Sequence, residues 1–161
     1  MLARDVMKSP VVTVQDTATL GEVARLLDEH DISGMPVVDD AGHMVGIISE
    51  LDLIRRSQQV QIARRNPFAW VSPHSSVGDI AVFTRGLCEV GETRVADAMT
   101  RKVIAVEEYD TLESVALLMA QRRINRVPVL SGGNLVGIIS RADLVWAMAN
   151  LCELRPGLFS K

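Results

Sequence analysis

The sequence predicts an α+β protein made of two copies of one β-α-β-β-α unit, with an insert between the copies. Three observations lead to this class. The chain repeats itself at a nearly constant spacing, each copy mixes short β-branched runs with helical patterns, and the composition suits an aliphatic core. Apolar residues make up 48% of the 161 residues and aromatic residues only 4%. Valine, isoleucine, leucine, alanine and methionine must therefore fill the core.

The repeat is visible in the order of identical residues. Under a shift of 92 positions, Asp5–Met7 aligns with Asp97–Met99, and Pro36-Val37 with Pro128-Val129. One residue is then lost in a turn, and a shift of 91 aligns Val45–Ser49 with Val136–Ser140 and Asp52-Leu53 with Asp143-Leu144. A shared Val-Gly-Ile-Ile-Ser pentapeptide followed at the same distance by Asp-Leu does not arise by chance, so the chain is internally duplicated.

Each copy opens with an extended run followed by a helix. The runs, rich in β-branched residues, are expected at Pro10–Val14 and Lys102–Val106. In the first copy Thr19 and Glu22 form a capping box at the start of the helix. The apolar stripe at helical spacing consists of Leu20, Val23, Ala24 and Leu27 in the first copy, and of Leu112, Val115, Ala116 and Met119 in the second.

A β-hairpin and a second helix complete each copy. The expected hairpin strands are Met35–Val38 with Met44–Ile48, and Val127–Leu130 with Leu135–Ile139, joined by tight polar turns. The second helices begin at Ser49 and Ser140. A three-stranded sheet with two helices on one face is small and leaves apolar surface to bury, so the two copies are expected to pair.

The expected division of the chain follows the copies. The predicted segments are repeat 1 at 1–65 (core 5–53), the inter-repeat insert at 66–94, repeat 2 at 95–152 (core 97–144) and a tail at 153–161. The first copy's second helix is expected to continue to about Arg65, and Val77–Cys88 fits an amphipathic helix. The insert serves either as packing that covers one edge or as a surface for a partner.

Charge, cysteine content and hydropathy argue against several classes of protein. A formal net charge of −3 argues against nucleic-acid binding, and arginine pairs such as Arg55-Arg56 are interpreted as solvated helix faces. Cys88 and Cys152 lie far apart, with no CxxC or metal-type spacing. A disulfide framework is therefore not expected, and a reducing cytoplasm fits best. No run approaches the roughly 18–20 apolar residues that span a bilayer, and the first residues do not resemble a signal peptide. A soluble protein without membrane partners is expected.

The ordered motifs resemble the CBS (cystathionine β-synthase) domain family. They are Asp-Val-Met, a strand, a capped helix, Ile-x-x-x-Pro-Val-Val, a hairpin and Gly-Ile-Ile-Ser-x-x-Asp-Leu, and the set occurs twice, as in the CBS pair called a Bateman module. The resemblance implies two repeats packed about a pseudo-two-fold axis with two clefts between them. It also implies a non-catalytic regulatory module that binds AMP, ADP, ATP, S-adenosylmethionine or a related adenosine ligand, and a homodimer of such pairs.

The sharpest local feature is Ser-x-x-Asp, at Ser49–Asp52 and Ser140–Asp143. A carboxylate can accept hydrogen bonds from both hydroxyls of a ribose diol. The same spacing also forms a helix capping box. The two interpretations are compatible, because the serine can cap the helix while the aspartate contacts the ligand.

The family resemblance assigns two candidate ligand sites, each combining Ser-x-x-Asp of one copy with the first strand of the other. The first comprises Lys8, Thr13, Ile32, Asn125, Arg126, Ile138, Ser140, Arg141 and Asp143. The second comprises Ser33, Ile47, Ser49, Asp52, Thr100, Arg101, Ala105 and Ile124. Backbone groups of the first strand are expected to contact the adenine edge, and Ile32 or Ile124 its face.

The charges around the two sites differ. The first has Lys8, Arg126 and Arg141 within reach, whereas the second has Arg101 and Lys102, opposed by nearby acidic residues. Phosphate needs cations or helix N-termini. We therefore expect the Asp143 site to prefer a phosphorylated ligand, and the Asp52 site to bind more weakly or to take an uncharged adenosine derivative.

No pattern predicts catalysis, a metal or a required cofactor. His30, His43 and His74 are scattered, and Gly132-Gly133 belongs to a hairpin turn rather than to a phosphate loop. Two functions follow. One is a sensor of an adenosine ligand that regulates an effector protein in trans. The other is a ligand-free interaction or dimerisation module in which Ser-x-x-Asp serves only as a helix cap.

Overall fold

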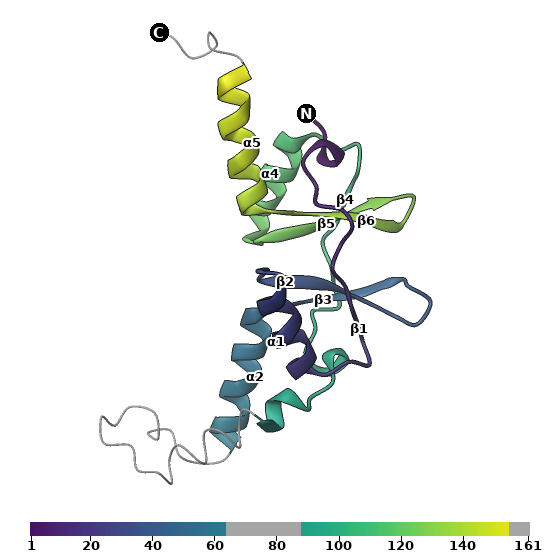
Figure 1. The fold of residues 1–161 in the computed structure, drawn as a ribbon, viewed down its shortest axis with the longest axis vertical. Helices are drawn as coiled ribbons and strands as arrows, with labels where there is room; N and C mark the ends of the chain where they lie inside the picture. The colour runs from purple at the N-terminus through teal and green to yellow at the C-terminus, as the bar shows by residue number, and fades with distance from the viewer. Residues whose placement is uncertain (64–87, 155–161) are drawn as a thin grey trace, which may run out of the picture. The chain divides into compact units, whose positions relative to one another are not determined.

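The computed structural model describes residues 1–63 and 88–154, and within them it contains two three-stranded sheets with order β1-β2-β3 and β4-β5-β6 (Figure 1). The elements are η1 (Ala3–Asp5), β1 (Val14–Gln15), α1 (Leu20–Glu29), β2 (Gly34–Val38), β3 (Met44–Ser49), α2 (Glu50–Ala63), η2 (Val95–Asp97), β4 (Val106–Glu107), α4 (Leu112–Arg122), β5 (Arg126–Ser131), β6 (Asn134–Ser140) and α5 (Arg141–Leu154). The predicted α+β class and the duplicated β-α-β-β-α order are confirmed.

The chain forms two compact units whose limits differ from those of the repeats. Unit 1 combines Met1–Val11 with Ile104–Lys161, and unit 2 is the continuous stretch Val12–Val103. Each unit therefore joins the β-α-β-β-α elements of one copy to the segment that precedes the first strand of the other copy. The predicted repeats, at 1–65 and 95–152, describe where the copies lie along the sequence rather than where the compact units divide.

Backbone hydrogen bonds attach each segment to its unit in the same way. In unit 1 the N–H of Lys8 donates to the carbonyl of Ile138 (2.9 Å), and the N–H of Ile138 donates to the carbonyl of Lys8 (3.1 Å). In unit 2 Thr100 and Ile47 exchange the equivalent pair of bonds, at 2.9 and 3.0 Å. Since buried backbone groups must find partners, these reciprocal pairs fix the register of each segment against β6 and β3.

One glycine in each hairpin lets the segment approach. Gly137 and Gly46 are both buried. A Cβ atom at Gly137 would lie 2.6 Å from Met7 Cγ and 2.8 Å from Met7 Cβ, and one at Gly46 would lie 2.5 Å from Met99 Sδ. Real Cβ atoms do not come so close to other heavy atoms. Glycine is thus required at these two positions by the close approach of a methionine side chain.

The first strand of each copy is shorter than its sequence predicts. β1 and β4 contain two residues each, and they pair in parallel with β2 and β5, with Val14 opposite Val37 and Val106 opposite Val129. The predicted extended runs began several residues earlier. Pro10 has no N–H to donate to a ladder, and the N–H of Val103 donates to the carbonyl of Arg101 within its own segment, at 3.0 Å.

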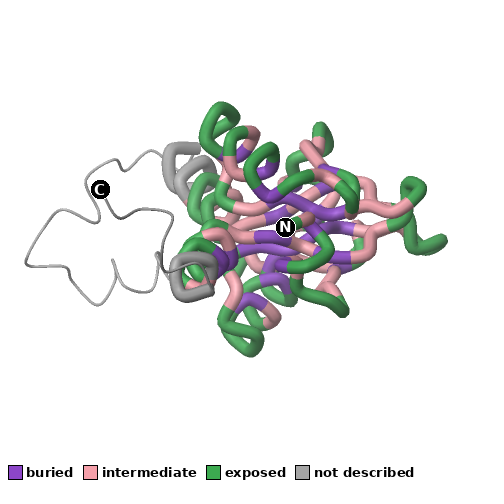
Figure 2. The backbone as a smooth tube through the Cα atoms, turned by 90° about the horizontal axis from the view of Figure 1, so that it is seen from above, coloured by how far each residue is buried: buried purple, intermediate pink, exposed green. Residues whose placement is uncertain are grey.

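The predicted helical stripes face two aliphatic cores. Leu20, Val23 and Leu27 of α1 are buried in one cluster, and Val115 and Met119 of α4 are buried in the second. Leu112 is buried in a smaller cluster with Val6 and Ala147. Ala24, predicted to share the buried stripe, is exposed, and Ala116 is half-buried. Against them pack buried residues of the hairpins, which are Met35, Val37 and Ile48 in unit 2 and Val127, Val129 and Ile139 in unit 1. Figure 2 shows the outer turns of the helices exposed, whereas buried positions concentrate in the strands.

Side chains cap both helices as their sequences suggest. The N–H of Glu22 donates to Thr19 Oγ1 at 3.3 Å, and the N–H of Ser114 donates to Thr111 Oγ1 at 3.2 Å. The hairpin turn of unit 2 is organised by Asp39, whose carboxylate accepts hydrogen bonds from Ala41 and His43. The backbone N–H of His43 is the main cause that lowers the pKa of Asp39 below its ordinary value of 3.8.

The expected second helices are confirmed, and part of the insert lies outside the described residues. α2 begins at Glu50, directly after the predicted Ser49, and extends to Ala63. The predicted Val77–Cys88 helix falls almost wholly in residues 64–87, which are not described, while residues 88–91 are helical. In the described stretches 1–63 and 88–154, no helix is long and apolar enough to cross a membrane.

Candidate ligand-binding site

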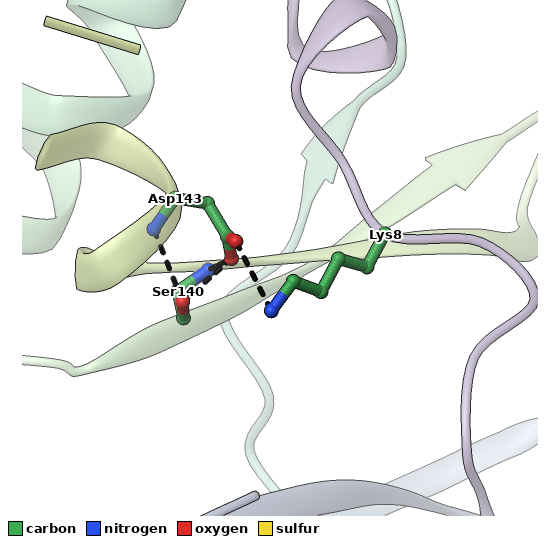
Figure 3. A network of polar contacts seen from close by, with 3 residues as sticks. All are labelled: Lys8, Ser140 and Asp143. Atoms are coloured by element: carbon green, nitrogen blue, oxygen red, sulfur yellow. Dashed lines mark hydrogen bonds and ion pairs between the residues drawn. The ribbon is translucent and has the colours of Figure 1, made fainter. Parts of the chain in front are cut away.

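Ser140 and Asp143 form a reciprocal cap at the start of α5 (Figure 3). The N–H of Ser140 donates to Asp143 Oδ2 at 2.8 Å, and its Oγ–H donates to the same oxygen at 2.5 Å. The N–H of Asp143 lies 3.3 Å from Ser140 Oγ, which accepts its hydrogen bond. The capping interpretation of Ser-x-x-Asp is therefore confirmed in this copy, and it uses only one oxygen of the carboxylate.

The second oxygen of Asp143 faces Lys8 of the N-terminal segment. Lys8 Nζ lies 3.4 Å from Asp143 Oδ1, with the lysine side chain 68% exposed and the aspartate side chain 11% exposed. The reciprocal backbone hydrogen bonds between Lys8 and Ile138 position the lysine beside Asp143. A buried carboxylate needs such a partner, whereas an exposed lysine loses little by leaving, since exposed ion pairs contribute about 0–1 kcal/mol.

The other predicted residues of this site in unit 1 surround the start of α5. Arg126 lies opposite Ser140 in the β5–β6 register. The carbonyl of Asn125 accepts the N–H of Arg141 at 3.0 Å, and Arg141 Nε lies 3.3 Å from the carbonyl of Ile124. We call these residues, together with Lys8, Ile138 and Asp143, the Asp143 half-site. Two further predicted members, Thr13 and Ile32, belong to unit 2, and their roles stay predictions.

Unit 2 repeats the cap at the start of α2. The N–H and the Oγ–H of Ser49 donate to Asp52 Oδ2 at 2.8 and 2.7 Å. The carbonyl of Ser33 accepts the N–H of Glu50 at 3.2 Å, as the carbonyl of Asn125 does for Arg141. Ser33, Ile47, Ser49, Asp52, Thr100 and Arg101 constitute the Asp52 half-site. Two more predicted members, Ala105 and Ile124, belong to unit 1, and their roles there stay predictions.

The two half-sites differ in which positions carry cationic side chains. Thr100 occupies the place that Lys8 takes in unit 1, because each exchanges backbone bonds with the isoleucine of its hairpin. Gly34 stands opposite Ser49 where Arg126 stands opposite Ser140. The guanidinium of Arg101 donates to the carbonyl of Ala96 at 2.8 Å. The Asp52 half-site thus lacks counterparts of two cations that surround Asp143.

A pocket beside Asp52 contains arginines that the sequence interpretation assigned to a solvated face. It has a volume of about 220 Å³ and is lined by Asp52, Arg55, Arg56, Asp97 and Ala98. Arg55 and Arg56 lie one helical turn beyond Asp52, at the i+3 and i+4 positions that share its helix face. The spacing of Arg55 and Arg56 from Asp52 could have indicated this pocket from the sequence. The same spacing is also typical of an ordinary surface ion pair.

Comparison with known families gives the identity of the fold and of the repeat. The family model of the CBS domain matches residues 3–59 and 95–150, which is more than half of the chain and falls once in each copy. The chain belongs to the CBS domain family, and it contains a tandem CBS pair. The expected family and the expected tandem of two CBS repeats are confirmed.

Several known proteins are similar to the chain over most of its length. An uncharacterized protein of Methanocaldococcus jannaschii is 36% identical over 154 residues, covering 92% of this chain and 91% of that protein. The crystal structure of the CBS domain of a CBS domain-containing membrane protein from Sphaerobacter thermophilus has 36% identity and a TM-score of 0.69, covering 91% of this chain and 86% of that one. The crystal structure of CBSX2 in complex with AMP has 24% identity and a TM-score of 0.68, covering 93% and 95%.

Proposed function

We propose that the chain is a non-catalytic regulatory module that binds an adenine nucleotide or another adenosine-containing ligand through Asp143 and Asp52. One observation carries the proposal. Each helix cap occupies Oδ2 of its aspartate, which leaves Oδ1 for a ligand. A carboxylate that caps a helix through one oxygen can still accept a charge-assisted hydrogen bond from a ribose hydroxyl through the other.

The Lys8–Asp143 contact supports a phosphorylated ligand at the Asp143 half-site. When a ribose hydroxyl takes the place of the ammonium group at Oδ1, the exposed Lys8 side chain is released close by. Its positive charge is then available to a phosphate. AMP, ADP and ATP carry both the diol and the phosphate. For CBSX2, which has the same fold, AMP is the bound molecule.

The regulatory role requires that a ligand favour one arrangement of the molecule. A ligand shifts such an equilibrium only by its differential affinity for the two arrangements. We propose that the module senses the level of its ligand and transmits it to an effector protein in trans. Two cysteines that do not suggest a disulfide framework support placing it in the cytoplasm.

A binding panel tests the proposal. AMP, ADP, ATP, S-adenosylmethionine and NAD are titrated into the protein by calorimetry, and the melting temperature is followed in parallel. We expect at least one adenosine compound to bind and to raise the melting temperature, because a ligand of the folded state adds about 2.7 kcal/mol of stability at a hundredfold excess over its Kd. Inosine monophosphate serves as a control that keeps ribose and phosphate but changes the base. No binding across the panel would contradict the proposal.

A second candidate function is a ligand-free interaction module. It is favoured by the observation that Ser-x-x-Asp serves as a helix cap in both copies. In that case the aspartates matter for stability alone. The binding panel separates the two functions, because the interaction module predicts no heat and no shift in melting temperature with any adenosine compound.

We also propose that the module forms a homodimer through α2 and α5. Both helices expose apolar residues at equivalent positions of the two copies: Ile54 is 52% exposed in α2, and Val145 is 65% exposed in α5, next to Trp146 and Met148 at 60% and 66%. Exposed apolar faces of this kind favour self-association. A second copy of the chain carries the same exposed apolar residues and is therefore the proposed partner.

Light scattering tests the dimer. We expect the mass of two chains for the wild type and of one chain for Val145→Glu, since burying an unpaired carboxylate in the contact is costly. Leu117→Glu is the matched control, because Leu117 is also exposed (57%) but lies on α4, and this variant should stay dimeric. A wild type with the mass of a single chain would contradict the dimer.

A further inference from the structure

One oxygen of the buried Asp143 carboxylate is held by a cation that is itself exposed. The N–H and the Oγ–H of Ser140 both donate to Asp143 Oδ2, at 2.8 and 2.5 Å. Asp143 Oδ1 instead pairs with Lys8 Nζ at 3.4 Å (Figure 3). The aspartate side chain is only 11% exposed and the lysine side chain 68% exposed. Lys8 therefore neutralises, from the solvent side, a carboxylate that is almost withdrawn from water.

The backbone of Lys8 is fixed, whereas its side chain is able to move. The backbone N–H and carbonyl of Lys8 are both bonded to Ile138, at 2.9 and 3.1 Å. A lysine side chain is a flexible four-carbon stem, so its ammonium group can leave Asp143 Oδ1 without disturbing these bonds. The ammonium group then stays close by, because the backbone holds the stem. A group tethered in this way competes with a free ligand at a high effective concentration.

Unit 2 has the same helix cap without this cation. Thr100 makes the equivalent pair of backbone bonds to its own hairpin, and the cap at the start of α2 again uses Oδ2 of Asp52. Threonine carries no charge, so the Thr100 position does not supply Asp52 with the cation that Lys8 supplies to Asp143. The ion pair is thus particular to unit 1 and is not a general consequence of the duplicated fold.

We propose that Lys8 is a built-in competitor that lowers the affinity of the Asp143 half-site for adenosine compounds without a phosphate. The inference rests on the proposed function and concerns the selectivity of that same site. A ribose hydroxyl reaches Asp143 Oδ1 only when the ammonium group leaves it, so every ligand first breaks the ion pair. A phosphorylated ligand offers the displaced ammonium group a new anion. Adenosine releases it into water and leaves a buried carboxylate without a cation, which is costly.

Removal of the lysine charge should therefore change the affinities for adenosine and AMP in opposite directions. Lys8→Met keeps an unbranched side chain but cannot compete for the carboxylate. We expect it to bind adenosine about two- to fivefold more tightly than the wild type, the factor that corresponds to an ion pair with one exposed partner. AMP should bind several-fold more weakly, because the loss of a charge-assisted contact with its phosphate outweighs the same gain. A lysine that only contacted phosphate would leave adenosine unaffected.

Calorimetry with adenosine and AMP in an Asp52→Asn background makes this measurement. The asparagine oxygen preserves the cap of α2 and removes the Asp52 carboxylate, so that the heat reports the Asp143 half-site. Lys8→Arg keeps a positive charge and should retain the wild-type preference for AMP. Arg25→Met is the matched control, because it removes an exposed cation from an ion pair with Glu29 on α1. This variant should change neither affinity.

The sign of the salt dependence is a second readout of the same competition. Salt screens an ion pair whose lysine is mostly exposed, whereas adenosine has no charge to screen. The affinity of the Lys8 protein for adenosine should therefore rise between about 0.05 and 0.5 M sodium chloride. The rise should be smaller in Lys8→Met, and AMP should show the opposite trend. A lysine with a merely structural role would give the same salt dependence for adenosine with and without its charge.

The outcomes separate this inference from the proposed function. If Lys8→Met binds adenosine no more tightly than the protein with Lys8 does, Lys8 does not compete for Asp143 and the inference is overturned. The same conclusion follows if the two proteins show equal salt dependence for adenosine. In both cases AMP binding leaves the proposed function intact. If neither protein binds adenosine or AMP, the proposed function fails and this inference fails with it.

Discussion

Asp143→Ala is expected to weaken binding of an adenine nucleotide at least about tenfold. The carboxylate would lose one or two charge-assisted hydrogen bonds to the ribose, each contributing roughly 1.5–3 kcal/mol, and 1.4 kcal/mol corresponds to a factor of ten in affinity. The variant also loses the cap of α5, so we expect a loss of about 0.5–2 kcal/mol in the free energy of unfolding. Calorimetry with AMP and urea denaturation measure the two effects separately.

Asp143→Asn separates the role in binding from the role in capping. An asparagine oxygen can still accept the N–H and Oγ–H of Ser140, so most of the stability should be retained. The negative charge is lost, and with it the ion pair to Lys8 and the stronger bond to the ribose. If Asp143→Asn and Asp143→Ala both bind AMP like the wild type, the carboxylate does not contact the ligand and Ser-x-x-Asp is a helix cap only.

Gly137→Ala is expected to detach the N-terminal segment from β6. The new Cβ would lie within 2.6–2.8 Å of two Met7 side-chain carbons, so the methionine, and the backbone that carries it, must move. Overpacking of this kind costs about 1–3 kcal/mol. Lys8 follows Met7 directly, so the same change should displace it from Asp143 and weaken nucleotide binding. Urea denaturation and calorimetry with AMP check the two consequences.

A double-mutant cycle identifies the contact that is responsible. Met7→Ala removes Cγ and Sδ of Met7 and leaves only its Cβ, 2.8 Å from the new Cβ, so Met7→Ala combined with Gly137→Ala should cost less than the sum of the two single changes. Gly91→Ala is the matched control: its Cβ would lie 3.9 Å from the nearest atom, in ordinary contact, and should leave stability unchanged or slightly higher. Full stability of Gly137→Ala would show that Met7 does not pack on this glycine.

The sequence predicted where the helices and hairpins lie better than it predicted which segments pair or pack with one another. The helices and hairpins followed from apolar spacing, capping residues and turn residues, which are local signals. The short first strands were overestimated, because β-branched composition indicates an extended chain but not whether a neighbour pairs with it. Local patterns also could not show that Met1–Val11 joins Ile104–Lys161. Lys8 was placed with Asp143 only through the family resemblance.

The candidate site was predicted in part for a similar physical reason. Ser-x-x-Asp was recognised because a cap and a ribose acceptor need the same spacing, and the cap is confirmed at both helices. Arg55 and Arg56 were interpreted as a solvated helix face, and Arg55 is exposed. Local spacing could not show that Asp97 of η2 lines the same pocket, because it lies far from Arg55 in the sequence.

The exchanged segments have a consequence for the order in which the protein can fold during synthesis. Unit 2 is continuous from Val12 to Val103, so it has all its parts once Val103 has left the ribosome. Unit 1 needs Met1–Val11, which are made before unit 2, and β6, which is made after it. The first residues must therefore remain available while a complete neighbour folds behind them. Because Lys8 bonds to Ile138 of β6, the segment that carries Met7 and Lys8 can dock only after unit 2 has been synthesised.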